Sequence, residues 1–132
     1  MSLFFFISTT IFGGFTWAAS AQTFDLAKEG VSIRIADLTI DPAQLEKYTA
    51  AVKEEIDDAV RLEPGVLAIY AVAIKGKPNQ IRFVEIYTGE DAYLKHRETP
   101  HFKKYFETTK SMITARELHG GIPLKLAGKK RR

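Results

Sequence analysis

The sequence predicts an α+β domain in which a four-stranded antiparallel sheet carries its helices on one face, the split βαβ arrangement. Segments with the two-residue period of strands and segments with the three- to four-residue period of helices follow in the order strand, helix, strand, strand, helix, strand. The 132 residues, of which 45% are hydrophobic and 27% charged, suit one packed domain. Because the chain has no cysteine, disulfides, thiolate nucleophiles and thiolate metal sites are excluded.

The first strand and the first helix are predicted over residues 31–62. Residues 31–40 alternate between two faces, as strand residues do. Asp41 can then accept hydrogen bonds from the free N–H groups of a helix start, and Pro42 suits the first helical position because it has no N–H to leave unpaired. Apolar side chains recur at three- and four-residue spacing through about Leu62, with charged residues on the opposite side.

A β-hairpin is predicted to follow this helix. A Glu-Pro-Gly sequence at residues 63–65 stops the helix, and residues 66–74 form a strand of nine residues without a charge. Residues 75–79 provide a turn, and residues 81–87 form the next strand. The two strands of this hairpin are the third and fourth elements of the predicted order.

The second half of the chain is predicted to contain two helices and a last strand. A short helix covers residues 89–96, and a Thr-Pro pair at residues 99–100 repeats the combination of a cap and a proline. An apolar stripe at helical spacing then extends over residues 102–113. Residues 116–126 form the last strand, which the glycine pair at residues 120–121 interrupts with a bulge or a bend.

The predicted strand at residues 66–74 is apolar on both faces. Tyr70 and its alternate neighbours point one way, and Ile69 and its alternate neighbours point the other. The helices can cover only one face, so we expect the other face to pack on the same face of a second copy. The result would be a homodimer in which two sheets close into an α+β barrel. A monomer with a modest apolar patch is the alternative.

Residues 1–21 are predicted to be a signal peptide. An apolar run, too short to span a bilayer, is followed at residues 19–21 by Ala-Ser-Ala, the small-x-small pattern of a cleavage site. Cleavage would leave a polar leader at residues 22–30, the domain at residues 31–126 and an exported protein, periplasmic or secreted, without a membrane span. Because residues 1–6 contain no Lys or Arg, an N-terminal membrane anchor and a cytoplasmic protein with a misassigned start remain as alternatives.

The charge distribution argues against a nucleic-acid partner. The formal net charge is +3, but the last four residues are all Lys or Arg, so residues 1–128 carry a net charge of −1. The basic character therefore belongs to a tail at residues 127–132. We interpret this tail as a solvated terminus and assign it no function.

Three motifs follow one another along the predicted domain. Glu-Pro-Gly at residues 63–65 ends the first helix, Glu85 lies near the end of the third strand, and His-Arg-Glu-Thr-Pro-His-Phe at residues 96–102 forms a corner between helices. In this order the sequence resembles the antibiotic biosynthesis monooxygenase family. The resemblance implies a ferredoxin-like subunit, a homodimeric α+β barrel and a pocket between sheet and helices. For some members it also implies oxygenation of quinols or polyphenols without metal or flavin.

The resemblance leads us to expect a cofactor-independent monooxygenase that acts with O₂ on a small aromatic, quinol or polyphenol substrate. Such an enzyme must deprotonate its substrate and exclude water, because triplet O₂ reacts with an electron-rich phenolate by single-electron transfer. Either His96 or His101 could be the base, and Glu85 could orient the imidazole or act as the base itself. The aromatic side chains expected to contact the substrate are Tyr70, Phe83, Tyr87, Phe102 and Tyr105.

Each candidate catalytic residue also has a structural interpretation. His101 could be a surface or capping residue of its helix, His96 could close the preceding helix, and Glu85 could pair with a cross-strand Lys or Arg. No metal site is expected, because the five-residue separation of the histidines lacks the i, i+4 geometry of a helical zinc pair.

Three other functions compete with oxygenation. The same fold could serve as a non-catalytic small-molecule binding or stress-response module, or as an isomerase that uses the same His and Glu for proton transfer. Haem degradation is disfavoured, because relatives of this fold that degrade haem use a tryptophan in the pocket. The only tryptophan, Trp17, lies in the predicted signal peptide.

Overall fold

The computed structural model describes residues 30–129, which form one four-stranded antiparallel sheet and a layer of helices. The elements follow the predicted order: β1 (Ser32–Ile40), the short 3-10 helix η2 (Pro42–Gln44), α1 (Leu45–Leu62), β2 (Val66–Ile74), β3 (Lys77–Tyr87), α2 (Glu90–Glu98), α3 (Pro100–Thr109) and β4 (Ile113–Gly121). The strands are arranged as β2-β3-β1-β4. The predicted α+β class and ferredoxin-like topology are confirmed.

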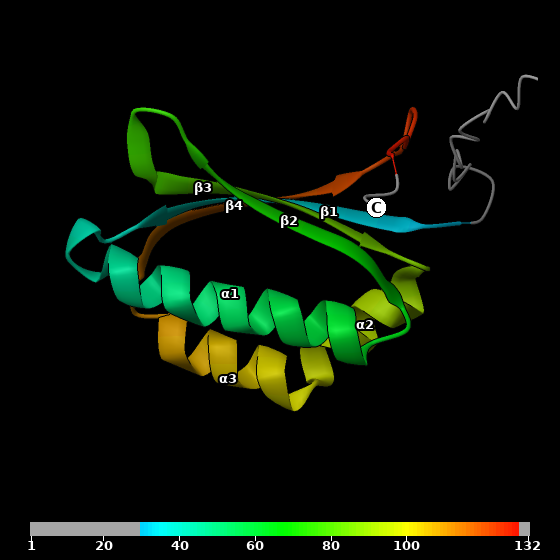
Figure 1. Ribbon diagram of the computed structural model, residues 1–132, viewed down its shortest axis with the longest axis horizontal. Helices are drawn as coiled ribbons and strands as arrows, with labels where there is room; N and C mark the ends of the chain where they lie inside the picture. The colour runs from blue at the N-terminus through cyan, green and yellow to red at the C-terminus, as the bar shows by residue number, and fades with distance from the viewer. Residues whose placement is uncertain (1–29, 130–132) are drawn as a thin grey trace, which may run out of the picture.

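The helices all lie on one side of the sheet, and α1 and α3 run side by side beneath it (Figure 1). The core fills the space between the two layers. Alternate residues of β1 and β3 meet one stripe of α1 there, as the two periodicities require. The buried core includes Ala36, Leu38, Ile40, Tyr48, Val52, Ala59, Ile81, Phe83 and Tyr87.

The first helix begins and ends as its sequence predicts. The Asp41 carboxylate accepts a hydrogen bond of 3.0 Å from the Ala43 N–H, and Pro42 opens η2, which leads directly into α1. At the other end, Glu63 adopts an extended conformation (φ −105°, ψ 109°). Pro64 favours this conformation in the residue before it, so the chain leaves the helix at Glu63.

Two predicted boundaries are corrected. The hairpin turn is only Lys75 and Gly76, so β3 begins at Lys77 rather than at residue 81. Gly76 has a φ of +82°, a backbone conformation that glycine adopts without strain. After this short turn Lys77 pairs with Ile74 and Gln80 pairs with Thr39, although the composition of residues 77–80 did not suggest a strand.

The last strand also differs from its prediction, because it covers Ile113–Gly121 rather than residues 116–126. The helix before it ends at Thr109, and the carbonyl of Met112 accepts a hydrogen bond from the Asp41 N–H, which draws the chain to the sheet. The glycine pair does not interrupt the strand: Gly120 and Gly121 pair with β1. A Cβ on Gly121 would lie 2.8 Å from the Ile33 side chain, so this close approach requires glycine.

The second face of the sheet is apolar along β2, and no helix of residues 30–129 covers it (Figure 1). Tyr70 is 61% exposed and Val72 is 54% exposed, whereas the intervening Ile69 belongs to the core. β2 is therefore apolar on both faces, as the sequence predicts. Packing of its uncovered face on a second copy remains an expectation.

The predicted signal peptide, residues 22–29 of the leader and residues 130–132 of the tail lie outside the described residues. Within the part of the chain that the structure describes, none of the helices combines the length and the apolar character needed to cross a bilayer.

Candidate functional site

A cavity of about 400 Å³ lies between the helices and the covered face of the sheet. Its polar groups differ in exposure: Glu55 and His96 are buried, whereas Arg97 and Arg116 are exposed. The remaining walls are largely apolar, and they include Leu38, Phe83, Tyr93, Phe102, Tyr105, Phe106 and Leu118. Cavities of a few hundred Å³ with such walls and few polar groups suit small organic ligands.

The cavity collects several of the side chains that the sequence singled out, although they come from β3, α2 and α3. The predicted site residues that line it are Phe83, Glu85, His96, Phe102 and Tyr105. His101 does not line this cavity but contacts the same polar network from the other side.

Two predicted substrate contacts lie elsewhere. Tyr70 points to the uncovered face of the sheet, because Ile69 occupies the inward position of the alternating strand. Tyr87 is completely buried and packs its ring 5.4 Å from that of His96, behind the cavity. We therefore remove Tyr70 from the predicted set of substrate contacts and assign Tyr87 a supporting position.

Thr99 builds the corner that brings the two histidines together. Its hydroxyl donates a 2.7 Å hydrogen bond to the His96 carbonyl at the end of α2 and accepts one of 3.3 Å from the Phe102 N–H at the start of α3. The chain turns between the two helices at this residue, so the imidazoles of His96 and His101 come within 6.3 Å, measured between ring centres.

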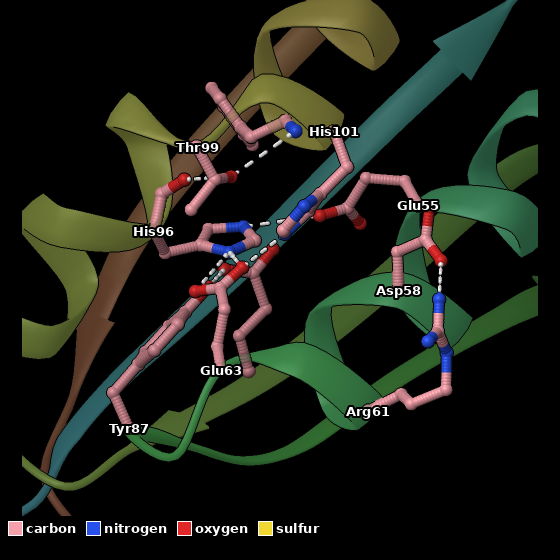
Figure 2. A network of polar contacts seen from close by, with 10 residues as sticks. Glu55, Asp58, Arg61, Glu63, Tyr87, His96, Thr99 and His101 are labelled. Carbon is pink, nitrogen blue, oxygen red and sulfur yellow. Dashed lines mark hydrogen bonds and ion pairs between the residues drawn. The ribbon is translucent and has the colours of Figure 1, made fainter.

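Glu63 joins the two histidines (Figure 2). Its Oε1 lies 2.9 Å from Nδ1 of His96 and also contacts Nε2 of His101. A carboxylate that accepts a hydrogen bond from the Nδ1–H group fixes the ring orientation and leaves Nε2 as the nitrogen free for chemistry. His96 is only 3% exposed, so this orientation is held inside the protein.

Glu55 faces the other nitrogen of the same ring. Its Oε1 lies 3.4 Å from Nε2 of His96 and makes no hydrogen bond within the described residues. Burial, reinforced by the negative charges of Glu85 and Glu63, raises the pKa of Glu55 to about 8. Glu55 therefore carries its proton at neutral pH and can act as a proton donor.

Glu85 is held by a tyrosine rather than by a cross-strand cation. The Tyr87 hydroxyl donates a 2.7 Å hydrogen bond to Glu85 Oε2. Burial raises the pKa of Glu85, while this hydrogen bond and the nearby His96 oppose the rise. Arg34 lies opposite Glu85 in the strand register, but its guanidinium instead pairs with Glu90, 2.5 Å away.

Three of these side chains could together hold a metal ion. Glu55, His96 and His101 each place one potential ligand atom within 4.8 Å of the others. The corner between α2 and α3 produces this proximity, although the spacing of the histidines is not that of a helical pair. In the structure the hydrogen bonds to Glu63 already occupy one nitrogen of each histidine, and a protonated Glu55 would have to ionise before it could serve as a ligand.

Comparison with known proteins now identifies the family. The family model for antibiotic biosynthesis monooxygenase matches residues 32–108, more than half of the chain. The chain belongs to the antibiotic biosynthesis monooxygenase family. None of the curated proteins matches it.

Solved structures show the same relationship. A Bacteroides thetaiotaomicron protein provisionally assigned as an antibiotic biosynthesis monooxygenase is 47% identical, with a TM-score of 0.74, over 80% of this chain and 99% of that one. A provisionally assigned monooxygenase from Lactobacillus acidophilus is 30% identical, with a TM-score of 0.68, over 70% of this chain but 44% of its own. A Nitrosomonas europaea protein at 18% identity, with a TM-score of 0.69 over 76% of this chain and 96% of that one, shows the fold alone.

Sequence reasoning missed two carboxylates of this family member's site. The sequence analysis assigns Glu63 to the helix stop and to the Glu-Pro-Gly motif of the family resemblance, and nothing local predicts that its side chain reaches the helix corner. Glu55 did carry a signal, because it lies three residues after Val52 and four before Ala59 on the buried stripe of α1. A carboxylate at such a position is buried by its helix and is often functional.

Proposed function

We propose that this chain is a cofactor-independent monooxygenase whose substrate is a small quinol or related polyphenol. The observation that carries the proposal is the buried imidazole of His96. Its Nδ1 is held by Glu63, and its Nε2 faces Glu55 at the buried end of an aromatic cavity. A base fixed in this way beside a cavity with largely aromatic and apolar walls suits the deprotonation of a phenol.

The reaction needs no reductant other than the substrate. A quinol and O₂ give a hydroxyquinone and water: one oxygen atom enters the ring, the other leaves as water, and the quinol supplies all four electrons. His96 Nε2 takes one phenolic proton, the phenolate transfers one electron to O₂, and the radical pair combines to form a carbon–oxygen bond. The resulting peroxide anion takes the proton of the substrate's second hydroxyl group. The ring hydroperoxide then loses water as its C–H becomes a carbonyl.

Glu55 is placed to serve the second half of this sequence. Because its pKa is raised to about 8, it holds a proton that it can give to the peroxide oxygen that leaves as water. The resulting carboxylate can recover a proton from the C–H bond that becomes the new carbonyl. His96 and Glu55 thus divide the roles of base and acid according to their surroundings.

The exposed arginines of the cavity suit a negative charge. Arg97 and Arg116 both line the cavity, and within residues 30–129 neither guanidinium forms an ion pair. A phenolate or an ionised hydroxyquinone would be attracted there, while its reacting carbon lies towards His96. The aromatic walls supply the remaining contacts.

Oxygen uptake tests the proposal. Purified protein treated with a chelator should consume one O₂ per quinol with a panel of hydroquinones, and the hydroxyquinone should appear as the product. His96→Gln should lower kcat by roughly 100-fold or more while circular dichroism shows an intact fold, because general-base catalysis contributes about 10² to 10⁴ in rate.

Two results would overturn this function. No oxygen uptake with any quinol would favour a binding module on the same fold. Activity that appears only after Fe²⁺ or Mn²⁺ is added would assign the cluster of Glu55, His96 and His101 to a metal ion instead.

A further inference from the structure

We propose that Glu55, His96 and His101 form a Zn²⁺ site, and that zinc bound there inhibits the enzyme because it occupies the nitrogen that acts as the base. Each of the three side chains places one potential ligand atom within 4.8 Å of the others. They come from α1, α2 and α3, which meet at the histidine corner (Figure 2). The zinc site stands on its own geometry, whereas the inhibition rests on the proposed function.

The separation of the first two ligands already suits a bound zinc ion. Glu55 Oε1 lies 3.4 Å from Nε2 of His96, which is longer than a good hydrogen bond. Two ligands of one tetrahedral zinc ion, each bound at about 2.0–2.1 Å, lie about 3.3–3.4 Å apart. His101 supplies the third ligand. Its side chain is more exposed than the other two, at 13%, so it can adjust to complete the set.

Glu55 lacks the partner that a buried carboxylate normally has. It is 6% exposed, and its Oε1 makes no hydrogen bond within the described residues. Nearly all buried polar atoms in proteins have a partner, because an unpaired one loses its hydration without compensation. A zinc ion that displaces the Glu55 proton would give this oxygen a partner.

The charges around the cluster also suit a divalent cation. Among residues 30–129, the ion pairs of Glu55 and Glu63 are formed with histidines only. Histidines bind a metal ion in their neutral form, so they add no charge of their own to such a site. When both are ionised, the two carboxylates carry two negative charges, which one Zn²⁺ ion balances.

Glu63 supports both histidine ligands. Its Oε1 lies 2.9 Å from Nδ1 of His96 and also contacts Nε2 of His101. A carboxylate behind a metal-bound histidine fixes the orientation of the ring and makes the other nitrogen a stronger ligand. His96 therefore presents Nε2 towards Glu55, and a set of imidazole and carboxylate ligands is one that zinc accepts.

A zinc ion can reach the cluster from outside the helix layer. Glu55 and His101 line an outer hollow together with Glu54, Asp58 and Lys104. Its lining thus contains three carboxylates and one lysine, a balance that favours the entry of cations. Glu55 also lines the aromatic cavity, so the cluster lies between the hollow and the substrate.

Zinc in this position would stop the proposed reaction. The neutral imidazole of His96 has one lone pair at Nε2, and a nitrogen that donates this pair to zinc cannot take the phenolic proton. Zn²⁺ has no redox chemistry, so it cannot activate O₂ in place of the lost base. We therefore expect an enzyme that works without a metal ion and that zinc inhibits.

Titration calorimetry with Zn²⁺ tests the site without any activity. Untagged protein should bind one ion per chain at neutral pH. Glu55→Gln and His101→Gln should each weaken binding by roughly 100-fold or more, since even the loss of a group that only supports a ligand costs about 10- to 100-fold. Two variants serve as controls. His119→Gln removes an exposed histidine that contacts Glu117, and Lys104→Gln changes the outer hollow without removing a ligand.

Three results would overturn the zinc site. The first is no binding at micromolar Zn²⁺. The second is binding that either ligand substitution leaves unchanged. The third is binding that His119→Gln abolishes, which would place the ion on the surface at the other histidine.

Oxygen uptake during quinol oxidation tests the inhibition. Zn²⁺ at concentrations that saturate the site should stop the uptake by wild type and Lys104→Gln, and a chelator should restore it. His101→Gln should need roughly 100-fold more zinc to lose half of its own metal-free rate. Uptake that continues with the site saturated would overturn the inhibition. If no quinol is oxidised at all, the proposed function fails, and the calorimetry still decides the zinc site.

Discussion

Replacement of Glu55 by glutamine should change how the stability of the protein depends on pH. Glu55 is 6% exposed, and its Oε1 has no hydrogen-bond partner within the described residues. Burial raises its pKa from the usual 4.5 to about 8. A difference of this size corresponds to roughly 5 kcal/mol, because each pKa unit is worth about 1.4 kcal/mol.

The sign follows from proton binding. Between about pH 4.5 and 8 the unfolded chain loses the Glu55 proton while the folded protein retains it, so the unfolded state binds fewer protons. The free energy of unfolding therefore falls as pH rises through this range and levels off above it. Glutamine resembles the protonated acid in shape and cannot ionise, so the Glu55→Gln variant should lack this fall.

Urea denaturation at pH 5 and at pH 9 measures the effect. The unfolding free energy of Glu55→Gln, measured relative to that of wild type, should be about 4 kcal/mol higher at pH 9 than at pH 5. This is slightly less than the full shift, because the unfolded chain has already lost part of its Glu55 proton at pH 5. Glu54→Gln is the control, since Glu54 is exposed and pairs with Lys104. If the difference between wild type and Glu55→Gln is the same at both pH values, Glu55 ionises normally, and its proposed role as a proton donor fails.

Two further predictions concern assembly and export. Tyr70→Lys should convert the expected homodimer into a monomer in sedimentation experiments. Tyr70 is exposed on the uncovered sheet face, and an unpaired charge buried in an interface costs several kcal/mol. Wild-type protein that sediments as a monomer at micromolar concentration would refute this interface. Mass spectrometry of protein from the native host should find a mature chain that begins at Gln22 outside the cytoplasm, and an intact N-terminus in the soluble cytoplasmic fraction would contradict the signal peptide.

The fold could be predicted because its elements have clear periodicities and clear ends. The apolar stripe of α1, the stop at residues 63–65 and the alternation in β1 are all local properties of the sequence. The boundaries of β4 were less accessible. Its glycines resemble an interruption, but Gly121 is required by close approach to Ile33, a contact between residues far apart in the chain.

Part of the site could also be predicted, because some of its residues stand out locally in the sequence. His96, Glu85 and Phe102 stand out by residue type and belong to motifs, and the structure places all three around one cavity. Tyr70 also stands out by type, but a strand sends alternate residues to opposite faces, and the sequence of β2 is apolar on both. Periodicity alone could not decide which face meets the helices.

The end of α1 explains why the histidine corner has its carboxylate. Pro64 keeps Glu63 extended, so its side chain leaves the helix, and Gly65 allows α2 to approach so closely that a Cβ there would lie 2.6 Å from that of Ala92. The approach brings His96 on α2 within reach of Glu63. The three residues of the helix stop therefore also set the geometry of the base, and a side chain at position 65 would disturb the site without touching the cavity.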